Sequence, residues 1–154
     1  MRVRLISLLL CGILILSVAA RNPVTRTSAA LSTSPATVVA SYFTLANSIL
    51  RGAAPSEMAA VYAPNSTLVV STPTGQTSVF HKLPAIEGWY KAFAAGHAGI
   101  QLKQVSQRTP LPGMVIHYEI AVDASNTVKG RCAHIFAVAN GMIVSDDFIV
   151  FYGG

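Results

Sequence analysis

The chain has 154 residues, enough for one ordinary domain with its own hydrophobic core. Charged residues make up only 11% of it, against a usual value of about 25%. The net charge is +5, but the basic residues are scattered and form no run, so the sequence predicts no nucleic-acid partner.

The first 20 residues have the layout of a secretory signal. A basic start, Met1–Arg4, precedes an apolar stretch over 5–20 that ends in small residues, which predicts cleavage after Ala20. A retained membrane anchor is the alternative, although the stretch is shorter than the roughly 20 residues of a spanning helix. Lipidation at Cys11 is a third reading, disfavoured by the bulky residue before it. We therefore expect a secreted, periplasmic or otherwise extracytoplasmic protein, touching the membrane only if 5–20 is retained.

Residues 21–35 are rich in Ser, Thr, Ala and Pro and show no apolar period, which predicts a flexible linker before a domain over 36–154. The first helix of that domain is marked by apolar residues at helical spacing between Pro35 and Gly52. The predicted elements up to residue 109 are a helix over 37–50, a short helix over 57–62, strands over 67–71 and 77–80, a helix from Leu83 to Gly96, and a strand over 100–109.

Three apolar, β-rich runs over 114–122, 127–139 and 142–152 complete the chain. Asn140-Gly141 separates the last two runs, and this dipeptide strongly favours a two-residue type I′ hairpin turn. The runs therefore predict an antiparallel meander. The element order α-α-β-β-α-β-β-β-β indicates an α+β domain with its helices packed on one face of the sheet.

This order, together with the segments Ala60–Leu68, Ala85–Tyr90 and Ala133–Ile143, resembles the nuclear transport factor 2-like superfamily. Its members include ketosteroid isomerases, scytalone dehydratase, limonene-epoxide hydrolase and the SnoaL-like polyketide cyclases. The resemblance implies a cystatin-like cone, in which a curved antiparallel sheet wraps round the N-terminal helices. The open end of such a cone often holds a small apolar molecule, and many members form homodimers through the sheet.

Strand alternation sorts the meander into two faces. Met114, Ile116, Tyr118 and Ile120 form an apolar set, which the expected register joins to the odd positions over 129–137. We expect this set to face the cone, and the resemblance adds residues of the helices and of the last strand. The predicted pocket residues are Tyr42, Trp89, Ile116, Tyr118, Arg131, Ile135, Asp146 and Phe148.

Three residues are candidates for catalysis. Asp146 in an apolar cone would be desolvated, which raises a carboxyl pKa and suits a general acid or base; the alternative is an exposed Asp146 or a pair with Arg131. The resemblance places Tyr42 where ketosteroid isomerases carry an oxyanion-binding tyrosine, although a core tyrosine is the simpler reading. His134 would act with Asp146 only if both faced the cone, and alternation places His134 on the other face.

Two classes of function remain open. The carboxylates that ketosteroid isomerases use have no counterparts here, since Val69–Thr72 and Ala133 occupy the matching positions. The histidines are not at a metal-binding spacing, so we predict no metal and no cofactor. The sparse titratable groups on the expected pocket face favour a small-molecule-binding or accessory domain. The alternative is a SnoaL-like isomerase, cyclase or dehydratase that performs cofactor-free acid–base chemistry on an apolar polycyclic or terpenoid substrate.

Overall fold

The computed structural model describes residues 33–153 and the side chains as far as Phe151. The predicted signal or anchor over 1–20 and most of the linker over 21–35 lie outside the described residues. None of the helices found within 33–153 has the length and apolar character needed to cross a membrane.

The first helix, α1 (Pro35–Leu50), runs along the concave side of the sheet. Ser34 caps it, because its hydroxyl oxygen accepts a hydrogen bond from the backbone N–H of Thr37 at 3.2 Å. Asn47 ties the helix to the sheet: its Oδ1 accepts from the backbone N–H of Leu102 at 2.9 Å, and its Nδ2 donates to the carbonyl of Leu102 at 3.2 Å. The buried residues of α1 are Val38, Val39, Tyr42, Ala46, Asn47, Ile49 and Leu50.

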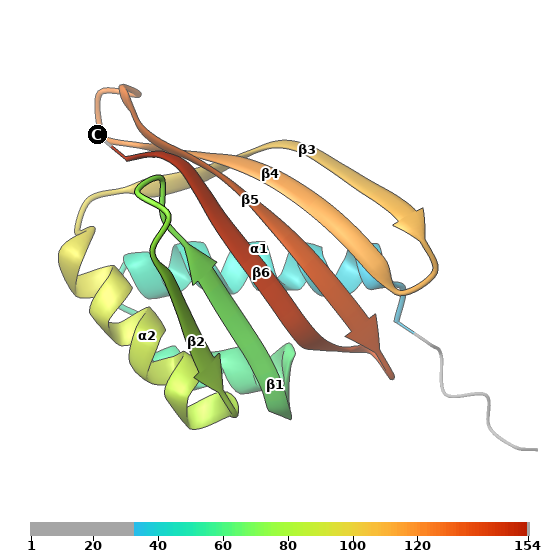
Figure 1. The fold of residues 1–154 in the computed structure, drawn as a ribbon. Helices are drawn as coiled ribbons and strands as arrows, with labels where there is room; N and C mark the ends of the chain where they lie inside the picture. Colours follow the sequence, from blue (N-terminus) through green and yellow to red (C-terminus); the bar gives the residue numbers. More distant parts are fainter. Residues whose placement is uncertain (1–32, 154) are drawn as a thin grey trace, which may run out of the picture.

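A six-stranded sheet curves round this helix in the order β2-β1-β6-β5-β4-β3 (Figure 1). The α+β cone with a curved sheet is confirmed, but the sheet is mixed rather than wholly antiparallel, because β1 and β6 run parallel. The meander has the predicted antiparallel pairing. The strands are β1 (Tyr62–Ser71), β2 (Thr77–His81), β3 (Gln101–Leu111), β4 (Met114–Val122), β5 (Val128–Ala139) and β6 (Met142–Gly153).

The region before β1 differs from the prediction. The short helix is a 3-10 helix, η1 (Pro55–Ala60), and β1 begins at Tyr62, so that residue belongs to the sheet and not to a helix. Pro64 lies inside β1, where a register shift between Tyr62 and Thr67 accommodates it. The helix α2 (Leu83–Gly96) begins where predicted, ends at the first of the two glycines expected to close it, Gly96 and Gly99, and packs against β1, β2 and η1.

Two tight turns fix the register of the meander. Asn140 and Gly141 have φ values of 52° and 75°, the left-handed pair that a type I′ turn requires. Gly113, between β3 and β4, has a φ of 76°, and a Cβ there would lie 2.9 Å from the carbonyl oxygen of Val138. A side chain at Gly113 is therefore excluded by the facing backbone as well as by its own conformation.

Candidate active site

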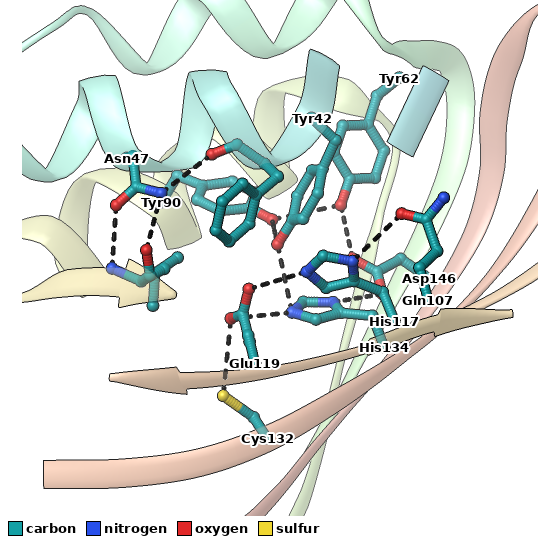
Figure 2. Close-up of polar contacts among 12 residues, drawn as sticks. Tyr42, Asn47, Tyr62, Tyr90, Gln107, His117, Glu119, Cys132, His134 and Asp146 are labelled. Atoms are coloured by element: carbon teal, nitrogen blue, oxygen red, sulfur yellow. Dashed lines mark hydrogen bonds and ion pairs between the residues drawn. The ribbon is translucent and has the colours of Figure 1, made fainter. Parts of the chain in front are cut away.

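Three tyrosines meet an acid and a histidine inside the cone, as Figure 2 shows. Tyr62 donates a hydrogen bond to Asp146 Oδ2 at 2.6 Å, and His134 Nδ1 lies 2.8 Å from Asp146 Oδ1. Tyr42 Oη lies 3.2 Å from His134 Nε2 and accepts a hydrogen bond from Tyr90 at 3.1 Å. The hydroxyls of Tyr62 and Tyr90 lie 3.2 Å apart, which closes the contacts into a ring of five side chains.

The ring is buried and comes from elements far apart in the sequence. Tyr42 lies on α1, Tyr90 on α2 and Tyr62 at the start of β1, while His134 and Asp146 face inward from β5 and β6. Buried polar groups are tolerated when they satisfy one another, and this ring pairs every one of its members.

Glu119 adds a second carboxylate to His134. Its Oε1 lies 3.5 Å from His134 Nε2 and accepts a hydrogen bond from the Cys132 thiol at 3.5 Å. Its Oε2 lies 3.4 Å from His117 Nε2, within ion-pair distance but not aligned for a hydrogen bond. On the other side of the His117 ring, Nδ1 lies 3.4 Å from Gln107 Oε1. His134 therefore stands between two buried carboxylates, Asp146 and Glu119.

These contacts shift the pKa values of His134 and Glu119 in opposite directions. Burial opposes a charged His134, but the charge of Asp146, the hydrogen bond to it and the contacts with Glu119 outweigh burial and raise the pKa of His134 to about 10. Burial also opposes ionisation of Glu119, but the close contacts with His117 and His134 outweigh it and lower the pKa of Glu119 to about 2. At neutral pH the site therefore holds an imidazolium beside an ionised Glu119.

The tyrosines stay protonated in this environment. Burial, followed by the nearby negative charges, raises the pKa of Tyr42 and Tyr62 well above the ordinary value of a phenol. A protonated His134 donates through both ring nitrogens, so Tyr42 accepts from His134 and from Tyr90. Within the described residues both hydrogen bonds of the Tyr42 hydroxyl are then accepted ones, so its own proton is not used by either of them.

A cavity of about 370 Å³ opens at the wide end of the cone, between the end of α2 and the sheet. Its floor includes Cys132, which contacts Glu119, and Phe148, whose ring stacks on His134 with centroids 4.4 Å apart. The charged group, formed by His134, Glu119 and Asp146, thus lies directly behind the floor of the cavity. The lining residues are Phe93, Gly96, His97, Ala98, Ile100, Leu102, Ala121, Lys129, Gly130, Arg131, Cys132, Phe148 and Val150.

Comparison with solved structures identifies the architecture. A putative SnoaL-like polyketide cyclase from Jannaschia sp. superposes with a TM-score of 0.64 at 8% identity, over 79% of this chain and 88% of that chain. A putative SnoaL-like isomerase from Agrobacterium tumefaciens gives a TM-score of 0.62 at 9% identity, over 75% and 95% of the two chains. An NTF2-like protein of unknown function from Mesorhizobium loti gives 0.60 at 14% identity, over 77% and 92%. The chain has the nuclear transport factor 2-like fold.

Sequence comparison adds nothing to this assignment, since no family model and no curated protein matches the chain. The assignment of the nuclear transport factor 2-like fold therefore rests on the comparison of structures. Among residues 33–153 no group of three or more His, Cys, Asp and Glu side chains is placed to hold a metal ion.

The predicted pocket face of the meander is the wrong one. Ile116, Tyr118 and Ile135 lie on the outer face of the nuclear transport factor 2-like sheet, where Tyr118 is 38% exposed. The expected pairing of even positions on β4 with odd positions on β5 is present, for example Tyr118 with Ala133. The prediction takes the apolar set to face the cone, whereas in the structure the cone buries the more polar set.

The other predicted site residues lie as follows. Tyr42 and Asp146 are buried in the ring, so Asp146 is neither exposed nor paired with Arg131. His134 faces the cone, contrary to the alternation argument that placed it outside. Arg131 is exposed and lies at the cavity, while Trp89 packs edge-on against Phe148.

Sequence reasoning missed the other members of the site: Tyr62, Tyr90, His117 and Glu119. The sequence predicts a helix over 57–62, which puts Tyr62 at a helix end, whereas the structure has it at the start of β1. His117 and Glu119 carried a usable signal, since they lie two residues apart on one strand face, and their cross-strand partners are His134 and Cys132. Four such side chains that face each other in pairs form either a solvent-exposed polar surface or a buried polar site. Because Asp146 beside them is buried, they form a buried polar site.

Proposed function

We propose that this protein is a cofactor-independent enzyme that moves protons on a small, mainly apolar molecule. The observation that carries the proposal is His134, held between Asp146 and Glu119 directly behind the floor of the cavity. An acid and a base side by side, shielded from water and next to a cavity, are what enolisation requires. The descriptions of two solved structures with this fold, as a SnoaL-like isomerase and as a polyketide cyclase, agree with this class of chemistry.

In this proposal each group has a separate task. Asp146 holds the Nδ1–H of His134, and Tyr62 holds the second oxygen of Asp146, so the imidazolium is fixed in orientation. The Nε2–H of His134 and the hydroxyl of Tyr42 lie 3.2 Å apart, and in this proposal a carbonyl oxygen that enters past Cys132 and Phe148 separates them and accepts from both. Glu119 takes the proton from the neighbouring carbon, and the electron pair of the broken C–H bond moves into the enolate, whose oxygen these donors stabilise.

Ligand binding itself would increase the basicity of Glu119. Its low pKa depends on its close contacts with His117 and His134. A carbonyl oxygen that takes over the Nε2–H of His134 removes part of that stabilisation and raises the pKa of Glu119. The proton then returns to the substrate at the same or another carbon, which completes an exchange or an isomerisation without any cofactor.

Deuterium incorporation from solvent tests this proposal without knowledge of the natural substrate. Small cyclic ketones are incubated with the protein in D₂O, and mass spectrometry measures deuterium at the carbons beside the carbonyl. We expect incorporation that His134→Gln and Tyr42→Phe each slow by about 10²-fold or more, the usual contribution of an acid–base group. Tyr118→Phe, on the outer face, is the matched control and keeps the wild-type rate. Wild-type protein that gives no incorporation, or His134→Gln protein that exchanges at the wild-type rate, refutes the proposal.

We also propose that two copies pair through the outer face of the sheet. Tyr118 and Phe151 are exposed there, and Ile116 and Ile135 are half-buried beside Tyr118. This apolar character suits an interface better than a solvent-exposed surface. Light scattering after gel filtration should give the mass of a dimer, and Tyr118→Lys should shift it to that of a monomer. A monomeric wild-type protein contradicts this arrangement.

Export remains our proposal for the N-terminal segment. Residues 1–20 carry the basic start and the apolar stretch that a secretory signal needs. N-terminal sequencing of protein recovered from outside the cytoplasm should begin at Arg21. Protein retained in the cytoplasm with Met1 intact contradicts export, and uncleaved protein in the membrane fraction supports the anchor instead.

A further inference from the structure

The outer face of the sheet is organised in rows that cross its strands. Paired residues of neighbouring strands lie side by side, so the pairing of β3 with β4, β4 with β5 and β5 with β6 gives each row directly. Their neighbours along the strands, such as His117 and His134, face the cone, and the rows therefore face outward. In the order β3-β4-β5-β6, three successive rows are Ser106-Tyr118-Ala133-Ile149, Arg108-Ile116-Ile135-Asp147 and Leu111-Met114-Ala137-Ser145.

The middle row carries opposite charges at its two ends. Arg108 on β3 and Asp147 on β6 are both exposed, and among the described residues neither forms an ion pair. The two residues between them, Ile116 and Ile135, are half-buried. Strands lie about 4.8 Å apart, so each charged residue lies about 7 Å from the line midway between β4 and β5, on opposite sides of it. A copy of this row turned end to end would therefore place a positive charge on a negative one at both ends.

The flanking rows are matched in size about the same line. Tyr118 on β4 is paired with the small Ala133 on β5, and Met114 on β4 is paired with the small Ala137 on β5. When either row is turned end to end onto a copy of itself, a large side chain lies over a small one. Alternation of large and small residues across facing positions lets two apolar layers interdigitate. Charge and size thus favour the same reversal of the rows.

We propose that the occupant of this face is a second copy of the chain, related by a two-fold axis that runs along the line between β4 and β5, midway between two aligned sheets. The inference rests on the dimer proposed above and adds its symmetry axis. The axis turns every row end to end, so Arg108 of each copy forms an ion pair with Asp147 of the other. The alternative aligned axis runs across the strands and leaves the middle row in its original direction. That axis would place Arg108 on Arg108 of the other copy and Tyr118 on Met114, so charge and size both disfavour it.

The row beyond Tyr118 sets the limit of the interface. Its members on β3, β4 and β5 are Lys103, Ile120 and Arg131, two of which are basic and none of which is acidic. The proposed axis would bring the two basic residues close to the same residues of the other copy, where like charges repel. The interface therefore ends before this row and is centred on the isoleucines of the middle row.

Complementary charge reversals test the axis. In a dimer of Arg108→Glu protein or of Asp147→Arg protein, both attractive contacts become repulsive. We expect each variant to raise the dissociation constant of the dimer about tenfold or more, measured by sedimentation equilibrium at low salt. An equimolar mixture of the two variants should form a heterodimer with a dissociation constant within about threefold of the wild type, because each of its two contacts again joins an acid to a base. Lys91→Glu, the same reversal at an exposed position of α2, is the control and leaves the dissociation constant unchanged.

Neutral variants keep the test decisive if circular dichroism shows that a reversed variant does not fold. Arg108→Gln and Asp147→Asn should each raise the dissociation constant about threefold. The double variant should raise it no more than either single variant, since all three lose the same two ion pairs. Effects of the single variants that add in the double variant overturn the inference.

The outcomes separate this axis from the dimer itself. Loss of affinity in both reversed variants and its recovery in their mixture support the axis. If Tyr118→Lys dissociates the dimer but the mixed variants do not pair, or if the reversed variants dimerise as tightly as the wild type, the outer face is the interface and the axis is wrong. A monomeric wild-type protein overturns both proposals. None of the tested residues belongs to the charged group, so the result does not depend on the deuterium experiment.

Discussion

Replacing Asp146 by Asn tests most directly whether the buried ion pair between His134 and Asp146 stabilises the fold. The amide keeps the size of the side chain and an oxygen for His134 Nδ1–H, but it removes the negative charge 2.8 Å from the ring. The pKa of His134 is raised from 6.5 to about 10. At about 1.4 kcal/mol for each pKa unit, that difference corresponds to about 5 kcal/mol of interaction between the imidazolium and its surroundings. Asp146 supplies the largest favourable part of it and Glu119 the remainder.

We therefore expect Asp146→Asn to lower the free energy of unfolding by about 3–5 kcal/mol, the usual cost of breaking a buried ion pair. Urea denaturation at pH 6 measures it, with folding monitored by Trp89 fluorescence. The matched control is Asp147→Asn, the same chemical change one residue along β6 at an exposed position, which should cost less than about 0.5 kcal/mol. If the two variants differ by less than 1 kcal/mol, the buried ion pair does not stabilise the fold and the reasoning fails.

The pH dependence of this difference has a definite sign. The folded-state pKa of His134 is raised above its unfolded value, so the stabilisation is fully present below pH 6.5 and is lost as the pH rises toward 10. Glu119 behaves in the opposite way: its folded-state pKa is depressed, so its contribution is present above pH 4.5 and is lost as the pH falls toward 2. The difference between wild type and Asp146→Asn should therefore be largest near pH 5–6.5 and shrink at alkaline pH. A difference that grows between pH 7 and 10 contradicts a protonated His134.

Three further substitutions test how the cone is held together, each measured by urea denaturation. Asn47→Ala should cost about 2–4 kcal/mol, because it leaves two buried backbone groups of β3 without partners, whereas Ser48→Ala, which loses two exposed bonds, should cost little. Gly113→Ala should cost at least about 1 kcal/mol more than Gly75→Ala. Both glycines have positive φ, but only the first would place its Cβ against a backbone carbonyl. Ser34→Ala should cost about 1 kcal/mol through loss of the α1 cap. Equal costs within either matched pair would show that the named contact is not the cause.

The fold could be read from the sequence because each local signal agreed with the others. Apolar spacing between Pro35 and Gly52 gave α1, and Asn140-Gly141 gave the last hairpin, whose φ values match the expected turn. The boundary at Tyr62 could not be read in the same way. Pro64 and Asn65 look like a helix stop followed by a loop, but a register shift in β1 carries the strand through them. That shift depends on pairing with β6, about 80 residues away, which no local pattern encodes.

The site could be predicted only in part, for a physical reason. Period-2 alternation separates the two faces of a strand but does not say which one is buried. The rule that the apolar set lies inside selected Ile116 and Tyr118, and it failed because buried polar groups satisfy one another here. Glu119 and His134 point to the correct buried face. Burying either of them alone would cost free energy, and this cost is avoided only because they contact each other. Their partnership follows from the expected pairing of β4 with β5, but the sequence alone left open which face of that pair the cone buries.

The energetics of the charged group support a functional origin for it. Desolvation of buried charged groups such as His134 and Glu119 costs several kcal/mol per ion, and they are tolerated only because their contacts with each other and with Asp146 outweigh that cost. Well-packed apolar residues of similar volume would give the cone equal or greater stability without such a balance. The rest of the interior follows that simpler rule, with Val39, Leu68 and Ile143 fully buried. A fold that needs only apolar packing, yet holds an imidazolium between two carboxylates at the floor of its cavity, has placed its charges where an acid–base reaction would use them.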